Sequence, residues 1–229
     1  FRDCREEGIH AVVNPPADPA QLVEGCTFLG GRTGLRFQGV FTPGLYTCQT
    51  RGCVAAGQSE DGFLYDIDRS LGTGDVDLRI VSEGNLATAC GETGFHLKLW
   101  QPEIRLNFDS LGDRALGCGG GIYVYERPLA SRASLRIECA ILAGNRKAGL
   151  GILSNALIEA RFLTLADNGD HGLNLARVDT ARFSADHCLL ANNLPAEFFG
   201  PSGTPITYSA FMNQAYPGSG NIQGNPGLV

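Results

Sequence analysis

The sequence predicts an all-β fold, a parallel β-solenoid in which each coil of roughly 25 residues holds three short strands. Three observations support this prediction. A glycine followed by an apolar, a variable and an apolar residue recurs along the chain, short alternating segments lie between these glycines, and pentapeptides ending in Asn align with one another. One repeat is too small to bury its own apolar face, whereas stacked repeats form continuous apolar columns.

The glycine motif predicts the first strand of each coil. It recurs at intervals of 23 to 32 residues and begins at Gly8, Gly34, Gly62, Gly94, Gly121, Gly149 and Gly172. Because side chains alternate along a strand, we expect the two apolar positions of each motif to face inward. The two inward columns are Leu35, Phe63, Phe95, Ile122, Leu150, Leu173 and Phe37, Tyr65, Leu97, Val124, Ile152, Leu175. The glycine is expected to supply a positive φ before the strand.

Two further strands per coil follow from other patterns. Alternating segments at Val76–Ile80, Ile104–Phe108 and Leu135–Cys139 predict a second strand with one face inward. The segments ILAGN (141–145), TLADN (164–168) and LLANN (189–193) superpose at offsets of 23 and 25 residues and predict a third. Asn tolerates a left-handed backbone and bonds to the coils above and below, so we expect a column of Asn145, Asn168 and Asn193.

The pattern predicts a single domain over residues 1–229, with about eight to nine coils. The chain begins at Phe1 without an initiator Met, so we expect it to be part of a longer chain. Residues 194–229 lose the regular pattern and contain Pro195, Pro201, Pro205 and Pro217. They are predicted to form a looser C-terminal cap, which covers the open edge that a solenoid otherwise exposes.

Composition argues against several classes of function. The formal net charge is −6, and only two lysines, Lys98 and Lys147, are present, which argues against a nucleic-acid partner and against a polybasic membrane patch. No apolar run reaches the roughly eighteen residues of a membrane span, so no transmembrane segment is predicted.

The eight cysteines predict disulfides in an oxidising compartment, in preference to a zinc site, because no CxxC pair is present. Three pairs are predicted: Cys90–Cys118 at one corner of adjacent coils, Cys48–Cys53 across a short loop, and Cys4–Cys26 one coil apart. Cys139 and Cys188 are separated by two coils, so we expect both to be free and to face inward.

The stacked ILAGN, TLADN and LLANN segments, with CGGGIYV (118–124) between coils, resemble right-handed parallel β-helix proteins of the pectin-lyase-like class. They are most similar to the bacterial secreted and cell-surface repeat proteins of that class. The tail GNIQGNPGLV (220–229) resembles their Gly-Asn-Ile-x-x-Asp-Pro-Leu segment, with Asn225 in place of Asp and Gly227 in place of Leu. The resemblance implies a right-handed helix and an extracellular, cell-surface or periplasmic location in a bacterium.

The resemblance does not specify function, because lyases, hydrolases, epimerases, phage spikes and inert adhesins share this scaffold. The first hypothesis is a non-catalytic structural or adhesion module, without a cofactor, that contacts other protein subunits or extracellular glycans. The alternative is a polysaccharide lyase or epimerase acting on acidic glycans. A loop of about fifteen or more residues over the site would favour the enzyme, and flat faces would favour the module.

Catalytic candidates lie at the corner before the glycine motif. A lyase needs an Arg or Lys base, and groups that neutralise the sugar carboxylate. Stacking of adjacent coils brings together Arg146, Lys147, Asp170 and His171, which could supply these groups. The alternative is that these charges occupy a solvated turn. The carboxylates are dispersed among coils, so no metal site is predicted.

Binding candidates lie in the variable, outward position of the glycine motif. That column contains His10, Arg36, Leu64, His96, Tyr123, Gly151 and Asn174. Its aromatic, cationic and amide members could bind a glycan or pack on a protein, and the binding candidates are Arg36, His96, Tyr123 and Asn174. The alternative is an ordinary sheet surface.

Overall fold

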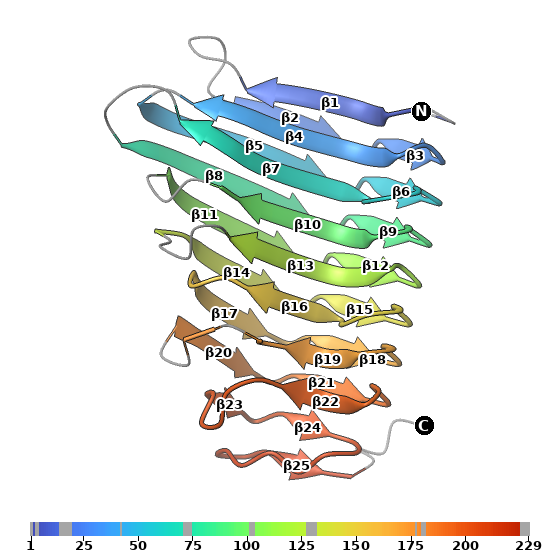
Figure 1. Cartoon of the computed structure of the whole chain (residues 1–229), viewed down its shortest axis with the longest axis vertical. Coiled ribbons are helices and arrows are strands. Elements are labelled where there is room, and N and C mark those ends of the chain that lie inside the picture. Colours follow the sequence, from blue (N-terminus) through green and yellow to red (C-terminus); the bar gives the residue numbers. More distant parts are fainter. Residues whose placement is uncertain are drawn as a thin grey trace.

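The computed structural model describes residues 2, 5–13, 20–41, 43–70, 75–100, 104–126, 132–176, 178–179 and 182–224. The chain winds into a stack of coils, with β1 at one end of the long axis and β25 at the other (Figure 1). Each coil contributes strands to three parallel sheets, which contain eight, eight and nine strands. The all-β solenoid with three strands per coil is therefore confirmed. Within the described residues, no helix has the length and apolar character needed to cross a membrane.

The first sheet holds the glycine motifs. Its strands are β1 (Glu7–Val13), β4 (Thr33–Phe41), β7 (Phe63–Ser70), β10 (Thr93–Leu99), β13 (Gly120–Glu126), β16 (Leu150–Leu153), β19 (His171–Asn174) and β22 (Ala196–Phe199). The second sheet holds the alternating segments. Its strands are β2 (Ala20–Glu24), β5 (Gly44–Arg51), β8 (Val76–Glu83), β11 (Ile104–Leu111), β14 (Ser134–Glu138), β17 (Leu157–Arg161), β20 (Phe183–Asp186) and β23 (Ile206–Thr207).

The third sheet consists of strands of two or three residues between two corners. They are β3 (Thr27–Leu29), β6 (Val54–Ala56), β9 (Leu86–Thr88), β12 (Arg114–Leu116), β15 (Ile141–Ala143), β18 (Thr164–Ala166), β21 (Leu189–Ala191), β24 (Ala210–Phe211) and β25 (Ile222–Gln223). Eight strands in each of the first two sheets correspond to about eight coils, of which about six form regular turns, close to the eight to nine coils predicted. The coils at the C-terminal end are the least regular, because β23, β24 and β25 each span only two residues.

The core runs the length of the stack, and the two predicted inward columns are confirmed. Every member of both columns is at most 2% exposed. The register pairs equivalent positions, for example Phe95 with Phe63 and Leu150 with Leu173. Aromatic members stack directly, with the ring centroids of Phe63 and Phe95 4.9 Å apart. The outward column is less regular than predicted, because Leu64 is also buried.

The glycines before the first-sheet strands serve a different purpose from the one predicted. None of the seven has a positive φ. They permit close packing instead: a Cβ at Gly34 would lie 2.6 Å from the carbonyl oxygen of Gly62, and one at Gly62 would lie 2.7 Å from that of Gly94. The recurring glycine is therefore required by the small space between coils at this corner.

Residues with a left-handed backbone conformation, that is a positive φ, form one column at each of the two corners that flank the third sheet. The first column is Gly25, Gly52, Gly84, Gly112, Cys139, Phe162, His187 and Tyr208, and the second includes Gly57, Ala89, Gly117, Gly144, Asp167 and Asn192. The expectation that Asn145 and its equivalents hold this conformation is wrong, because the left-handed residue precedes each of them. Cys139 was predicted to face inward, but its place in the first column turns it outward and exposes it.

The predicted column of asparagines is confirmed as a buried hydrogen-bond ladder. The backbone N and Nδ2 of Asn145 donate to Oδ1 of Asn168 at 3.2 and 2.9 Å. The same two groups of Asn168 donate to Oδ1 of Asn193 at 3.1 and 2.7 Å. Asn193 donates in turn to the buried carboxylate of Glu197, which ends the ladder.

A second ladder at the other corner contains a buried acid. Asp113 is 0% exposed, and its carboxylate accepts hydrogen bonds from the backbone N of Asn85 at 2.9 Å and from Ser110 Oγ at 2.7 Å. Burial raises the pKa of Asp113 above its ordinary value, although these hydrogen bonds act in the opposite direction. The ladder therefore holds a carboxylate at a position where an amide would make similar bonds.

The predicted disulfides are not formed among the described residues, where Cys26, Cys48, Cys53, Cys90, Cys118, Cys139 and Cys188 are all free. The Cys48–Cys53 pairing is wrong because Cys48 faces the core from β5, whereas Cys53 lies beyond the left-handed Gly52, at the next corner. Cys4 lies outside the described residues. Cys188 is free and buried, as predicted.

We expect Leu173→Ala to lower the free energy of unfolding by about 2–5 kcal/mol, because it leaves a cavity in a column with no space to collapse. Urea denaturation measures the change. Ser184→Ala, on the exposed face of β20, is the control and should change stability by less than about 0.5 kcal/mol. An equal, small effect of both variants would contradict the stacking register.

We expect Asp113→Asn to raise the free energy of unfolding at neutral pH by about 1–3 kcal/mol, because it removes a buried charge while keeping an oxygen for Asn85. The pKa of Asp113 is raised in the folded state, so its carboxyl stabilises the fold when protonated, and this stability is lost as the pH rises through the folded pKa. The advantage of the variant should therefore shrink as the pH falls. Urea titrations at several pH values test this; an advantage that grows in acid would contradict it.

Candidate functional site

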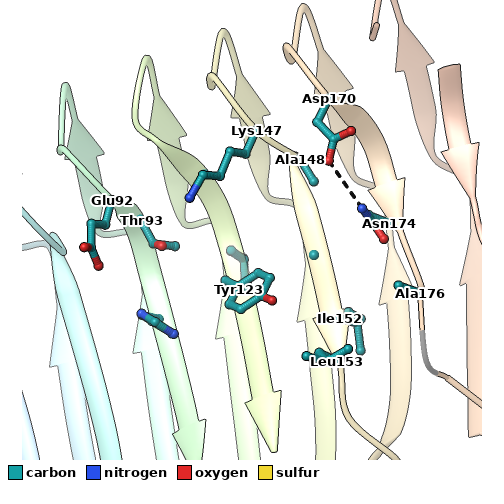
Figure 2. Close-up of a pocket in the computed structure, with 14 residues that line it drawn as sticks. Glu92, Thr93, Tyr123, Lys147, Ala148, Ile152, Leu153, Asp170, Asn174 and Ala176 are labelled. Atoms are coloured by element: carbon teal, nitrogen blue, oxygen red, sulfur yellow. Dashed lines mark hydrogen bonds between the residues drawn. The ribbon is translucent and has the colours of Figure 1, made fainter. Parts of the chain in front are cut away.

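A hollow of about 350 Å³ opens on the outer face of the first sheet and extends across β10, β13, β16 and β19. Figure 2 shows the side chains that surround it. The polar ones include Glu92, His96, Tyr123, Lys147, Asp170 and Asn174. The hollow therefore collects groups from four successive coils that are far apart in the sequence.

The hollow exists because several outward positions carry little or no side chain. Gly120, Ala148, Gly151 and Ala176 line it. Gly151 occupies the outward column between Tyr123 and Asn174, and a Cβ there would lie 2.6 Å from Cδ2 of the Tyr123 ring. The missing side chain leaves the phenol ring room to lie over the glycine.

The N-terminal half of the same face is closed by its own polar contacts. The Arg36 guanidinium binds Glu7 at 3.2 Å and Asp66 at 2.8 Å. Asp66 also accepts a hydrogen bond from Nε1 of Trp100 at 2.9 Å. Arg36, a predicted binding residue, therefore lies outside the hollow and is already occupied by these carboxylates.

His96 is held at the edge of the hollow by a buried carboxylate. Its Nδ1 lies 3.1 Å from Oδ2 of Asp61, which is 1% exposed. The imidazole also meets the Tyr123 ring edge-on, with the ring centroids 5.5 Å apart. Because Asp61 and Tyr123 restrain the ring, His96 presents a fixed surface to the hollow.

Lys147 and Asp170 come from corresponding corners of consecutive coils, and both line the hollow. The Lys147 side chain is exposed and extends over the strand that carries Tyr123 (Figure 2). No hydrogen bond or ion pair engages its amine among the described residues. Asp170 instead accepts a hydrogen bond from Nδ2 of Asn174 at 3.3 Å. The hollow therefore offers one free cation beside a carboxylate–amide pair.

The other two catalytic candidates do not line the hollow. The Arg146 guanidinium donates a hydrogen bond to the carbonyl oxygen of Gly91, two coils away. Nδ1 of His171 lies 2.7 Å from Oδ1 of Asp170, although outside hydrogen-bond geometry, and its ring packs against Phe199 with the centroids 5.1 Å apart. Arg146 therefore links its corner to an earlier coil, whereas His171 packs against an aromatic ring of the next coil.

Of the predicted site residues, the structure brings together His96, Tyr123, Asn174, Lys147 and Asp170. Asp61, the partner of His96, was not among the candidates, because the contact runs diagonally between coils and no periodic pattern marks it. Gly151 was present in the outward column, and its lack of a side chain was the available signal for a hollow.

Among the described residues, no group of three or more His, Cys, Asp or Glu side chains could hold a metal ion. The sequence matches no family model, and no curated protein or solved structure matches it. Of the features that the resemblance to pectin-lyase-like repeat proteins implies, the structure shows the parallel β-solenoid with three sheets.

Proposed function

We propose that the chain is a non-catalytic binding module that holds a glycan in the hollow of the first sheet. One observation carries the proposal: a half-exposed aromatic ring, Tyr123, stands beside the polar groups of Lys147, Asp170 and Asn174 over an open floor. A sugar has an apolar C–H face that packs on an aromatic ring, and hydroxyls that bond to carboxylate, amide and amine groups. The volume of about 350 Å³ lies within the range of small-ligand sites.

The shape of the hollow favours an extended oligosaccharide. It crosses four strands of one sheet, and neighbouring strands are about 4.8 Å apart. Successive coils therefore present polar groups along a line on which successive sugar units can bind. A flat protein surface would leave the hollow unfilled, so the geometry favours a glycan over a protein subunit at this position.

The connections between strands favour a module over an enzyme. Among the strands that the structure describes, consecutive strands are joined by fewer than fifteen residues, and the longest of these connections joins β24 to β25 at the C-terminal end. Connections this short favour an open hollow, whereas a closed active site needs a cover that excludes water. We place the module outside the cell, on the surface or in the periplasm of a bacterium, on the resemblance of residues 118–124 and 220–229 to secreted repeat proteins.

The alternative function is a lyase or epimerase that acts on acidic glycans. The amine of Lys147, which is engaged by no carboxylate in the part of the chain that the structure describes, is the observation that favours it. A lysine base could remove the proton beside a sugar carboxylate, and His96 lies on the same hollow. New unsaturated ends that absorb in the ultraviolet, formed when the protein is mixed with acidic polysaccharides, would establish the enzyme in place of the module.

We expect Tyr123→Ala and Lys147→Ala each to weaken oligosaccharide binding at least about tenfold, since each removes a group that faces the ligand. Isothermal titration with neutral and acidic oligosaccharides measures the affinity. Lys98→Ala is the matched control: Lys98 is the only other lysine and lies on β10 of the same sheet, outside the hollow. Equal losses in Lys147→Ala and Lys98→Ala would contradict a site in the hollow.

We expect Gly151→Asn to abolish binding while the protein remains folded. The position faces outward and its φ is not positive, so the backbone accepts a side chain, whereas the new group occupies the floor and displaces the Tyr123 ring. Circular dichroism and the melting temperature check the fold, and the same titration checks binding. Unchanged affinity in a folded variant would show that the ligand lies elsewhere.

A further inference from the structure

Two pairs of free cysteines stack directly between adjacent coils. Glu24 pairs with Arg51 and Thr27 with Val54, so Cys26 and Cys53 are in register at the first corner. Thr88 pairs with Leu116, and the same register continues to Cys90 and Cys118 at the second corner. In-register neighbours of parallel strands lie about 4.8 Å apart at Cα, which is within the 4.4–6.8 Å range of disulfides.

Each pair occupies a position that polar side chains hold in other coils. The backbone N of Cys118 donates to Oδ1 of Asn145 at 2.9 Å, as in the asparagine ladder. One coil earlier, the backbone N of Cys90 donates to Sγ of Cys118 at 3.4 Å, so the sulfur takes the place of the amide oxygen. At the other corner, the backbone N of Cys53 donates to Oδ1 of Asn85 at 2.9 Å.

The two sulfurs of the second pair differ in acidity. Hydrogen bonding from Cys90 lowers the pKa of the Cys118 thiol, and the charge of Arg146 acts in the same direction. The pKa of Cys90 is raised, because its thiol donates to Cys118 and is buried. The two sulfurs are buried against each other, at 1% and 0% exposed, so a sulfenic acid on Cys118 has the thiol of Cys90 beside it.

We propose that the pairs Cys26–Cys53 and Cys90–Cys118 are latent cross-links between coils that hydrogen peroxide closes into disulfides. The Cys118 thiolate attacks one peroxide oxygen and expels hydroxide, which forms a sulfenic acid. The sulfur of Cys90 then attacks the sulfur of that group; the S–S bond forms as water leaves, and the Cys90 proton passes to the leaving oxygen. Each pair loses two electrons, one peroxide is reduced, and two waters are formed.

The chain contains matched controls for both pairs. Cys188 stands in the same column as Cys26 and Cys53, but its neighbours are Leu163 and Ser209, whose hydroxyl accepts a hydrogen bond from the backbone N of Cys188 at 3.0 Å. Cys48 is buried in β5, and its register partners on the two sides are Gln21 and Ile80. Neither residue has a thiol in the next coil.

The test treats the folded chain with a small excess of peroxide, then alkylates it under denaturing conditions and maps disulfide-linked peptides by mass spectrometry without reduction. We expect the two pairs to be linked, Cys48 and Cys188 to be alkylated, and the melting temperature to rise by about 10–20 °C, because each bond closes a loop of nearly thirty residues. Dithiothreitol should reverse the rise.

Cys118→Asn, which introduces the residue that Asn145 supplies in the next coil, should remove only the Cys90–Cys118 bond and part of the increase in melting temperature. Cys53→Ser should remove only the first bond, and Cys188→Ser should leave both. Disulfides that join other cysteines, or sulfinic and sulfonic acids on unpaired cysteines, would overturn the proposal. An unchanged melting temperature after both bonds form would show that they do not stabilise the stack.

Discussion

The backbone hydrogen-bond register between coils is the constraint on which the rest of the structure depends. Parallel, in-register strands place each residue directly above its equivalent in the next coil. All residues of one column therefore have similar surroundings. A side chain of the wrong size or polarity disturbs its neighbours in the coils on both sides. This explains why the inward columns are apolar at every level and why glycine recurs where Gly34, Gly62 and Gly94 approach one another.

The same register creates the candidate site. Because the fold needs only the inward columns, the outward columns are free to vary, and their content decides what each face can do. Near the N-terminus the outward groups satisfy one another, as Arg36 does with Glu7 and Asp66. Further along, Gly151 and Ala148 interrupt the packing, and groups from successive coils converge on the resulting hollow.

The sequence was informative where a feature repeats with the coil. The core columns recur in every coil and the asparagines in three successive coils, so both could be predicted from spacing alone. Features that depend on where a side chain points within one coil could not be predicted from spacing. Cys48 and Cys53 are close in sequence but face different parts of the interior, and Cys139 takes the outward, left-handed place that Gly112 holds one coil earlier. The contact between Asp61 and His96 also joins unlike columns, which no periodicity reveals.

The polar ladder at the second corner has a direction, and this direction explains where its unusual members lie. Between the side chains of the ladder, each amide donates to the next one toward the C-terminal end, and its second N–H donates to a backbone carbonyl of the preceding coil. The last acceptor needs no proton to donate, and the carboxylate of Glu197 fits that place. Toward the N-terminus, the sulfurs of Cys118 and Cys90 replace the amides in two coils, and the amide of Gln58 continues the column in the coil before them. A thiol is a weaker hydrogen-bond partner than an amide, so the coils joined through Cys90 and Cys118 are held less firmly by the ladder than those below them. A covalent bond at that level would replace the missing hydrogen bonds where the ladder is weakest.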